Sequence, residues 1–183
     1  IRTHHPTLAL DDFLDLVVEM GFSGITNEPF CSLYGEYFAK QMEQAGVGFS
    51  REVELIQRAH AKDIFTVAWA MSPEEASQMA QAGADVIGAM IGVTVGGMSG
   101  ALETTPLEQA TRDVQAMAEA AKRSNPDVIV ITHGGPFHDV ETARYSIMHS
   151  EAVGYASGSS GERIPTEKAI IEITQQYKAI QLD

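Results

Sequence analysis

Apolar residues recur along the chain with two alternating periods, one typical of amphipathic helices and one typical of buried strands. The first helical segment ends before Gly21 and carries five apolar residues on one face, at Leu10, Phe13, Leu14, Val17 and Val18. Short apolar runs rich in β-branched residues lie between such segments and indicate strands. The pattern predicts strands at residues 23–27, 63–69, 86–90, 128–132 and 152–156. It predicts helices at residues 8–20, 34–44, 50–62, 73–82, 105–123, 138–149 and 165–180.

Two of the predicted helices begin with a capping motif. Ser72–Glu75 places a capping hydroxyl, a proline at the first helical position and a glutamate three residues on. Thr105–Glu108 repeats the same order of residue types. Such motifs satisfy the exposed backbone N–H donors at a helix start. We therefore expect each motif to open a helix.

Strands that alternate with helices of this length predict an α/β fold with a parallel sheet and right-handed crossovers. The five predicted strands fit an open, doubly wound sheet, and the 183 residues are fewer than the roughly 250 of a complete (β/α)8 barrel. The chain nevertheless begins at Ile1–Pro6, which has the pattern of the polar end of a strand. Length alone favours the open sheet, whereas this start indicates that N-terminal units of a barrel are missing.

Composition limits the classes of partner. The chain is 44% hydrophobic and 20% charged, as is usual for a globular domain. A net charge of -13, without any lysine or arginine run, argues against nucleic acid. Cys31 is the single cysteine, and the sequence has no charged leader and no apolar stretch of about 18 residues. We expect a cytoplasmic protein with no membrane partner.

Two glycine-rich corners give the strongest indication of function. Thr132–Pro136 and Ser157–Arg163 each follow an apolar run and each precede a helical pattern. Glycine lets backbone N–H groups approach an oxyanion closely, and the start of a helix favours negative charge. In a barrel the loops after the last two strands commonly hold a phosphate. Either corner alone is better explained as a plain turn, but together they predict an anion site built from Gly134, Gly135, Gly158, Ser159 and Ser160.

Polar residues at two strand ends are candidates for catalysis. His133 ends an apolar strand, so its imidazole would lie in the mouth of a barrel and transfer protons there. Glu28 and Asn27 end the strand at 23–27, where a carboxylate beside an amide can bind a metal, take a proton or hold a substrate hydroxyl. The alternatives are a packed structural histidine and an Asx-type turn before Pro29. We assign Glu28 and His133 as catalytic and Asn27 as substrate-binding.

Further candidates lie around the same mouth. The planar fork of Arg163 suits a carboxylate or phosphate, although an ion pair between loop and helix is the alternative. Trp69, at a strand end, is expected to form a wall of the substrate pocket. The loop at 92–104 is long enough to cover the site, or else to pack against a neighbouring protomer.

Five segments, taken in order, carry a resemblance to a known family: Glu19–Ile25, Ala82–Ile87, Thr94–Ala101, Thr132–Pro136 and Gly158–Glu167. They resemble the phosphoenolpyruvate hydrolase-like family of TIM barrels, which is related to the phosphoenolpyruvate mutase and isocitrate lyase group. The resemblance implies that Ile1–His4 ends the third barrel strand and that the five predicted strands are the fourth to the eighth. It implies a single TIM-barrel domain over residues 1–183, truncated at its N-terminus, from which the first two β/α units are absent. The family's domain also occurs fused to signalling proteins and to a plant virus-resistance protein.

The residues and the resemblance together favour an enolate-type enzyme of the hydrolase or lyase class. Its substrate would be a small phosphorylated or carboxylic acid such as phosphoenolpyruvate, and magnesium would neutralise the charge of the enolate. The alternatives are a TIM-barrel domain that senses a small molecule for signal transduction without turnover, and an interaction scaffold. Because an incomplete barrel leaves a sheet edge uncovered, we also expect an N-terminal extension or a homo-oligomeric contact there.

Overall fold

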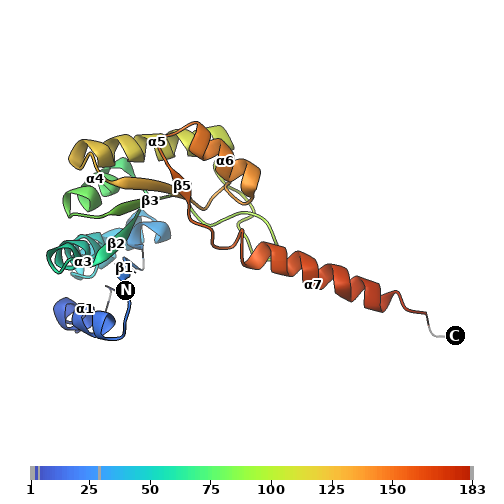
Figure 1. The fold of residues 1–183 in the computed structure, drawn as a ribbon, viewed down its shortest axis with the longest axis horizontal. Coiled ribbons are helices and arrows are strands. Elements are labelled where there is room, and N and C mark those ends of the chain that lie inside the picture. The colour runs from blue at the N-terminus through green and yellow to red at the C-terminus, as the bar shows by residue number, and fades with distance from the viewer. Residues whose placement is uncertain (1–2, 4, 29, 182–183) are drawn as a thin grey trace.

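The computed structural model describes residues 3, 5–28 and 30–181, and its centre is a parallel five-stranded sheet (Figure 1). The strands follow the chain in spatial order, β1-β2-β3-β4-β5. A doubly wound sheet reverses its strand order at a switch point, whereas a barrel does not. The prediction of a partial barrel is therefore confirmed over the open alternative. The strands are β1 (Gly24–Thr26), β2 (Phe65–Ala70), β3 (Val86–Met90), β4 (Ile129–His133) and β5 (Gly154–Tyr155).

Every predicted helix is present, with ends that differ by at most two residues from the prediction. The helices are α1 (Leu10–Glu19), α2 (Glu36–Gln44), α3 (Phe49–Ala61), α4 (Pro73–Gln81), α5 (Leu107–Ser124), α6 (Val140–Met148) and α7 (Arg163–Lys178). A short 3-10 helix, Cys31–Tyr34, precedes α2 and was not predicted. The predicted strand at 152–156 is reduced to the two residues of β5.

The two capping motifs behave differently. The Ser72 hydroxyl accepts the backbone N–H of Glu75 at 3.2 Å, and Pro73 opens α4 as predicted. The motif at Thr105 was interpreted wrongly, because α5 begins only at Leu107 and has no side-chain cap. Pro106 has a ψ of 145°, which is extended, so it precedes the helix instead of opening it.

Successive side chains of each strand point to opposite faces of the sheet. One face is covered by helices and the other is concave. Helices α3 to α6 pack against the first face, where small side chains such as Ala68, Ala70 and Ala89 are fully buried and let the helices approach closely. Residues of the opposite parity point to the concave face, among them Trp69 and His133. This is the face that lines the interior of a complete barrel.

The two ends of the chain differ in how they pack. Of the predicted strand end Ile1–His4, only Thr3 is described; its backbone N–H donates to the Glu28 carbonyl at 2.9 Å, so it lies beside the end of β1. At the other end α7 leaves the sheet and projects away from the body of the molecule (Figure 1). Among the described residues, no helix is long and apolar enough to cross a membrane.

Candidate active site at the carboxyl ends of the strands

Trp69 lies across the concave face at the centre of the strand ends. A side chain on Gly88 of β3 would overlap the indole, so the missing side chain is what lets the ring lie flat on the sheet. The indole reaches across to His133 on β4, with ring centroids 4.9 Å apart and planes tilted by 54°. Phe30 lies edge-on to the indole, with ring centroids 6.1 Å apart. Trp69, His133 and Phe30 therefore form a cluster of rings at the ends of the strands.

The imidazole of His133 is held in one orientation. Its Nδ1 lies 2.7 Å from the backbone carbonyl oxygen of Ala156, just after β5. A carbonyl oxygen can only accept, so Nδ1 carries the proton and donates it to this bond. Nε2 bonds to no described residue. The ring therefore presents a free nitrogen lone pair next to Trp69 when it is neutral.

Asn27 is placed in a buried network instead of the mouth. Its Oδ1 accepts the backbone N–H of Trp69 at 2.7 Å, and its Nδ2 donates to the Trp69 carbonyl at 3.3 Å. Nδ2 also donates to the carboxylate of Glu52, which is fully buried. Both polar atoms of the amide are thus used to hold the end of β1 against β2.

Glu52 connects this network to the 3-10 helix. Its second oxygen accepts the backbone N–H of Cys31 at 3.0 Å. Burial raises the pKa of Glu52 above its ordinary value of 4.5, against the opposing effect of these hydrogen bonds. Burial, together with the Glu52 carboxylate, raises the pKa of Cys31 to about 12. The thiol is therefore protonated, so Cys31 is not a candidate nucleophile.

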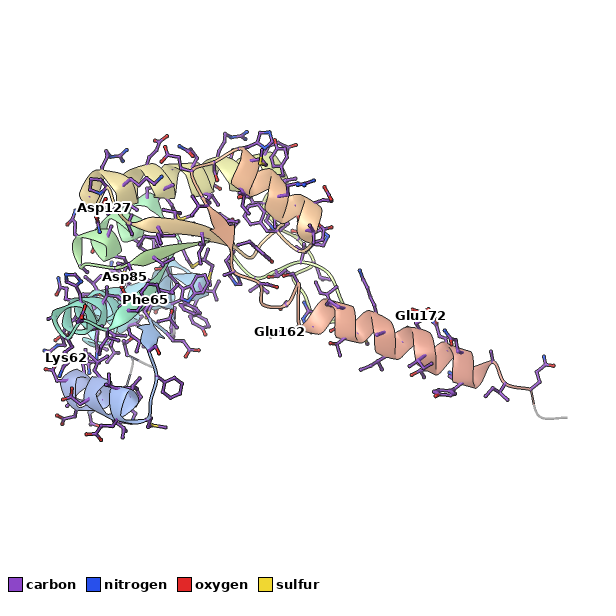
Figure 2. The ribbon with its side chains drawn as sticks, viewed as in Figure 1. Lys62, Phe65, Asp85, Asp127, Glu162 and Glu172 are labelled. Carbon is purple, nitrogen blue, oxygen red and sulfur yellow. The ribbon has the colours of Figure 1, made fainter. Side chains whose placement is uncertain are left out.

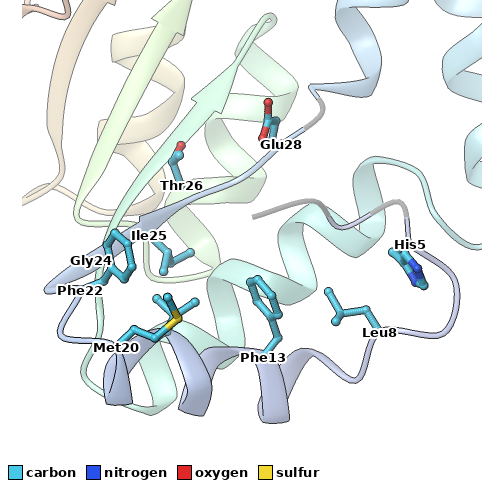
Figure 3. A pocket seen from close by; sticks show the side chains of 10 residues that line it. His5, Leu8, Phe13, Met20, Phe22, Gly24, Ile25, Thr26 and Glu28 are labelled. Atoms are coloured by element: carbon cyan, nitrogen blue, oxygen red, sulfur yellow. The ribbon is translucent and has the colours of Figure 1, made fainter.

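Glu28 is exposed at the end of β1, and its carboxylate bonds to no described residue. Together with Thr26 it borders a cavity of about 570 Å³ between α1 and β1 (Figure 3). The figure shows Phe13, Met20 and Leu8 along the α1 side of this cavity and Glu28 on the strand above them. Glu28 is therefore an exposed carboxylate at the rim of a mostly apolar hollow that His5 and Thr26 also line.

The corner after β4 is packed. Gly134 and Gly135 are buried and have positive φ angles of 74° and 56°. The Gly135 N–H donates to the Gly92 carbonyl at 3.0 Å, and the Gly135 carbonyl accepts the N–H of Val95 at 3.1 Å. A side chain on Gly134 would overlap the Gly92 carbonyl oxygen. This corner is shaped by its contact with the loop after β3.

The corner after β5 is open by comparison. A methyl group on Gly158 would meet only the His133 ring, at an ordinary 3.5 Å from Cε1. Among the described residues, no acceptor takes the backbone N–H groups of Gly158, Ser159 and Ser160. The Ser160 hydroxyl bonds to the Tyr155 hydroxyl at 2.5 Å. The two corners do lie side by side, joined through His133 and Ala156, but only the second offers unpaired donors together.

Arg163 ties the loop at 92–104 to the start of α7. Its guanidinium pairs with Glu167 at 3.1 Å and donates to the Gly96 carbonyl at 3.0 Å. Glu167 in turn accepts the backbone N–H of Met98 at 2.8 Å. The ion pair lies within α7 and is therefore not the loop-to-helix ion pair given above as the alternative for Arg163. The loop is joined to α7 by the two hydrogen bonds, at Gly96 and Met98.

The structure thus brings Trp69, His133 and Gly158 together at the mouth. Sequence reasoning missed Gly88 and Glu52, although both left a signal. A glycine inside the apolar run 86–90 indicates a close approach, and Glu52 has the same helical phase as the buried Leu55, Ile56 and Ala59. Within the described part of the chain, no three His, Cys, Asp or Glu side chains are grouped to hold a metal ion.

Comparison with known proteins adds a family to this geometry. The phosphoenolpyruvate hydrolase-like family matches residues 1–180. The chain is 41% identical over 179 residues to the ToMV susceptible protein tm-1(GCR26) of Solanum lycopersicum, covering 97% of this chain and 24% of that protein. It is 29% identical over 175 residues to the putative transcriptional regulatory protein y4pA of Sinorhizobium fredii, covering 96% and 29%. The chain spans under a third of the length of either relative.

Among solved structures, the chain is similar to a catalytic lysine mutant of Ruminococcus gnavus sialic acid aldolase. The TM-score is 0.56 at 13% identity, over 88% of this chain and 50% of that one. At this identity the likeness concerns the fold.

Proposed function

The chain belongs to the phosphoenolpyruvate hydrolase-like family, and on this premise we propose that it is an enzyme of the enolate type. Its substrate would be a small phosphorylated or carboxylic acid such as phosphoenolpyruvate, and the reaction a hydrolase or lyase step. The observation that carries the proposal is the free Nε2 of His133, fixed by Ala156 beside the Trp69 wall. Barrel enzymes place their catalytic groups at this end of the strands.

In the lyase form of the proposed chemistry the substrate is a hydroxy acid whose hydroxyl lies on the carbon β to the carboxylate. Neutral Nε2 of His133 takes the hydroxyl proton, the C–O bond becomes a carbonyl, the C–C bond breaks, and its electron pair passes to the enolate oxygen of the acid fragment. The ring is then a cation whose Nδ1–H still donates to Ala156. Transfer of the proton from Nε2 to the enolate carbon restores the neutral ring and leaves two products, a carbonyl compound and a carboxylic acid.

The remaining residues bind and orient the substrate in this proposal. The unpaired N–H groups of Gly158, Ser159 and Ser160 hold its anionic end, and Trp69 covers one side. Glu28 lies three strands from His133, roughly 14 Å along the sheet by ordinary strand spacing. It would therefore act from the opposite side of the substrate and not in a hydrogen-bonded pair with His133.

Four other predicted site residues are proposed to act indirectly. Asn27 holds the Trp69 backbone, and Gly134 with Gly135 lets the loop after β3 approach the corner. Arg163 fixes that loop to α7. Since the described residues supply no cluster that fits a divalent cation, no step of the proposed reaction passes through magnesium.

The test is the substitution His133→Asn. The asparagine amide can replace Nδ1–H against the Ala156 carbonyl, while nothing replaces Nε2. We expect turnover of a panel of phosphorylated and dicarboxylic acids to fall by about 10² to 10⁴, with unchanged thermal stability. His149→Asn, at an exposed histidine, is the matched control. Normal turnover by a folded His133→Asn variant would remove the catalytic role.

A sensing function is the second candidate, because one relative is named as a putative transcriptional regulatory protein. In this case the same open corner binds a metabolite without converting it. Calorimetry with the acid panel separates the two functions: binding without product formation favours the sensor. If no acid binds or raises the melting temperature, both functions are excluded in favour of a scaffold.

A further inference from the structure

Among the described residues, Glu52 is the single charged side chain that is fully buried. It lies in the first turn of α3, which packs against β2, and side chains crowd the space between this helix and the sheet (Figure 2). Within the same part of the chain, no lysine, arginine or histidine forms an ion pair with it. Burying a carboxylate without a cation costs stability, whereas burying an apolar side chain in its place would not. The position of Glu52 therefore indicates a task beyond packing.

Through one carboxylate oxygen, Glu52 acts on the backbone of Trp69 by way of Asn27. The Asn27 side chain accepts the Trp69 N–H at 2.7 Å and donates to the Trp69 carbonyl at 3.3 Å. An asparagine amide can turn over about its last bond, which would exchange its oxygen and its nitrogen. The carboxylate accepts a hydrogen bond from Nδ2 and would repel Oδ1 in the same place. Glu52 therefore selects the one orientation of Asn27 that holds both backbone groups of Trp69.

Through its other oxygen, Glu52 acts on Phe30. That oxygen accepts the backbone N–H of Cys31 at 3.0 Å and so fixes the peptide unit that follows Phe30. Phe30 has φ and ψ angles of 59° and 64°, a left-handed conformation that is strained for an aromatic residue. Such a conformation persists only where the surrounding structure holds it. In this conformation the Phe30 ring lies edge-on to the Trp69 indole, with ring centroids 6.1 Å apart.

We propose that Glu52 is the positioning residue of the Trp69 indole. It holds the backbone of Trp69 through Asn27 and the neighbouring ring through the peptide unit after Phe30. The indole lies beside the His133 ring, with centroids 4.9 Å apart, where the proposed function places the substrate. The catalytic meaning of this role rests on the proposed function, whereas the fixed position of the indole does not. Glu52 acts only through these two connections and moves no proton in the reaction.

The substitution Glu52→Gln tests the proposal, with Trp69 as the reporter. Glutamine is nearly isosteric with glutamate but offers one acceptor oxygen, so its amide nitrogen must face one of the two N–H donors. Trp69 is the single tryptophan, and time-resolved fluorescence anisotropy therefore measures the motion of this indole alone. We expect the amplitude of its nanosecond motion to rise roughly twofold. The matched control is Glu43→Gln, which alters an exposed carboxylate that accepts the Ser50 N–H at 3.1 Å and should leave the indole motion unchanged.

A reversed pair of acid and amide provides the rescue. Asn27→Asp alone places a second carboxylate against Glu52, and we expect it to free the indole at least as much as Glu52→Gln. In the double variant the new glutamine donates to the new aspartate, which still accepts the Trp69 N–H, and the glutamine oxygen accepts the Cys31 N–H. The double variant should therefore return the indole motion close to its natural amplitude. A loss caused by altered packing alone would not be recovered in this way.

Turnover supplies a second measurement. For an acid that the natural chain converts, we expect Glu52→Gln to raise KM about tenfold and to change kcat by less than about threefold, because the indole binds the substrate and His133 is unchanged. An unchanged KM overturns the positioning role. A natural chain that converts no acid contradicts only the proposed function, because the fluorescence measurement still decides the role of Glu52.

The fluorescence measurement overturns the proposal in two ways. The first is an indole that moves no more in folded Glu52→Gln than in the natural chain, and the second is a double variant without recovery. Should Glu52→Gln fail to fold, Phe30→Leu tests the second connection by removing the ring that Glu52 holds beside the indole. Unchanged indole motion in that variant also overturns the proposal.

Discussion

The two glycine-rich corners look alike in sequence but differ in the structure. At Gly134 and Gly135 the backbone is in the left-handed region and is pressed against Gly92. At Gly158 the backbone is outside that region and the space beside it is open. The first corner uses glycine to pack one loop against another, and the second leaves donors free.

This difference shows that glycine content alone does not identify an anion site. A glycine N–H serves a ligand only where no carbonyl of the protein already accepts it. The Gly135 N–H is taken by Gly92, so our proposal places the anion on the second corner. Four substitutions test the contrast between positions that are packed or hydrogen-bonded within the protein and positions that are not.

The largest effect is expected for Gly134→Ala. The new methyl would overlap the Gly92 carbonyl oxygen, and alanine is strained at a φ of 74°. We expect the free energy of unfolding to fall by about 3–5 kcal/mol in denaturant titrations. Gly21→Ala is the control for strain alone, because its φ is 89° with nothing within 4 Å, and should cost about 1 kcal/mol. Equal losses for both would show that the corner is not tightly packed.

Gly88→Ala should destabilise by about 2 kcal/mol through overpacking against the indole of Trp69. Trp69 is the single tryptophan, so its fluorescence emission reports the displacement directly. Adding Trp69→Leu removes the clash, and the double variant should lose less stability than the two single changes summed. Strictly additive losses would contradict the contact.

Glu52→Gln tests the buried hydrogen-bond network that Glu52 forms with Asn27 and Cys31 at the end of β1. Burial raises the pKa of Glu52 in the folded protein, so its contribution to stability is complete below about pH 4.5 and is lost as pH rises through the raised pKa. The glutamine cannot ionise. We expect the stability of the natural chain relative to the variant to fall by on the order of 1 kcal/mol over this rise. If the stabilities of the natural chain and the variant change in parallel with pH, folding does not raise the pKa of Glu52.

The smallest effect on stability is expected for Gly158→Ala, within about 0.5 kcal/mol. The methyl meets only the His133 ring at contact distance. The same variant should bind inorganic phosphate more weakly than the natural chain in calorimetry, because the methyl narrows the approach to the corner. A large loss of stability would show that this corner is packed like the first one.

Much of the fold was predictable because its signals are local. Apolar periodicity located each α-helix and strand named above, though not the 3-10 helix, and the Ser72 motif opened α4 where predicted. Pro106 shows the limit: the same residue types stand at 105–108, yet the chain stays extended there. The strand β5 shows a second limit of local pattern, because it has only two residues where five were predicted. The length of a strand depends on the neighbouring strand that supplies its hydrogen bonds, which for β5 is β4.

The sequence by itself determined the alternation of helices and strands, the parallel sheet and the position of His133, Trp69 and Glu28 at strand ends. Only the tertiary structure decided which polar groups stay free, because a hydrogen-bond partner such as Ala156, Gly92 or Glu52 lies more than twenty residues away in the chain. The local pattern of apolar and polar residues determines where the chain forms helices and strands. Distant segments decide whether its donors and acceptors are already satisfied.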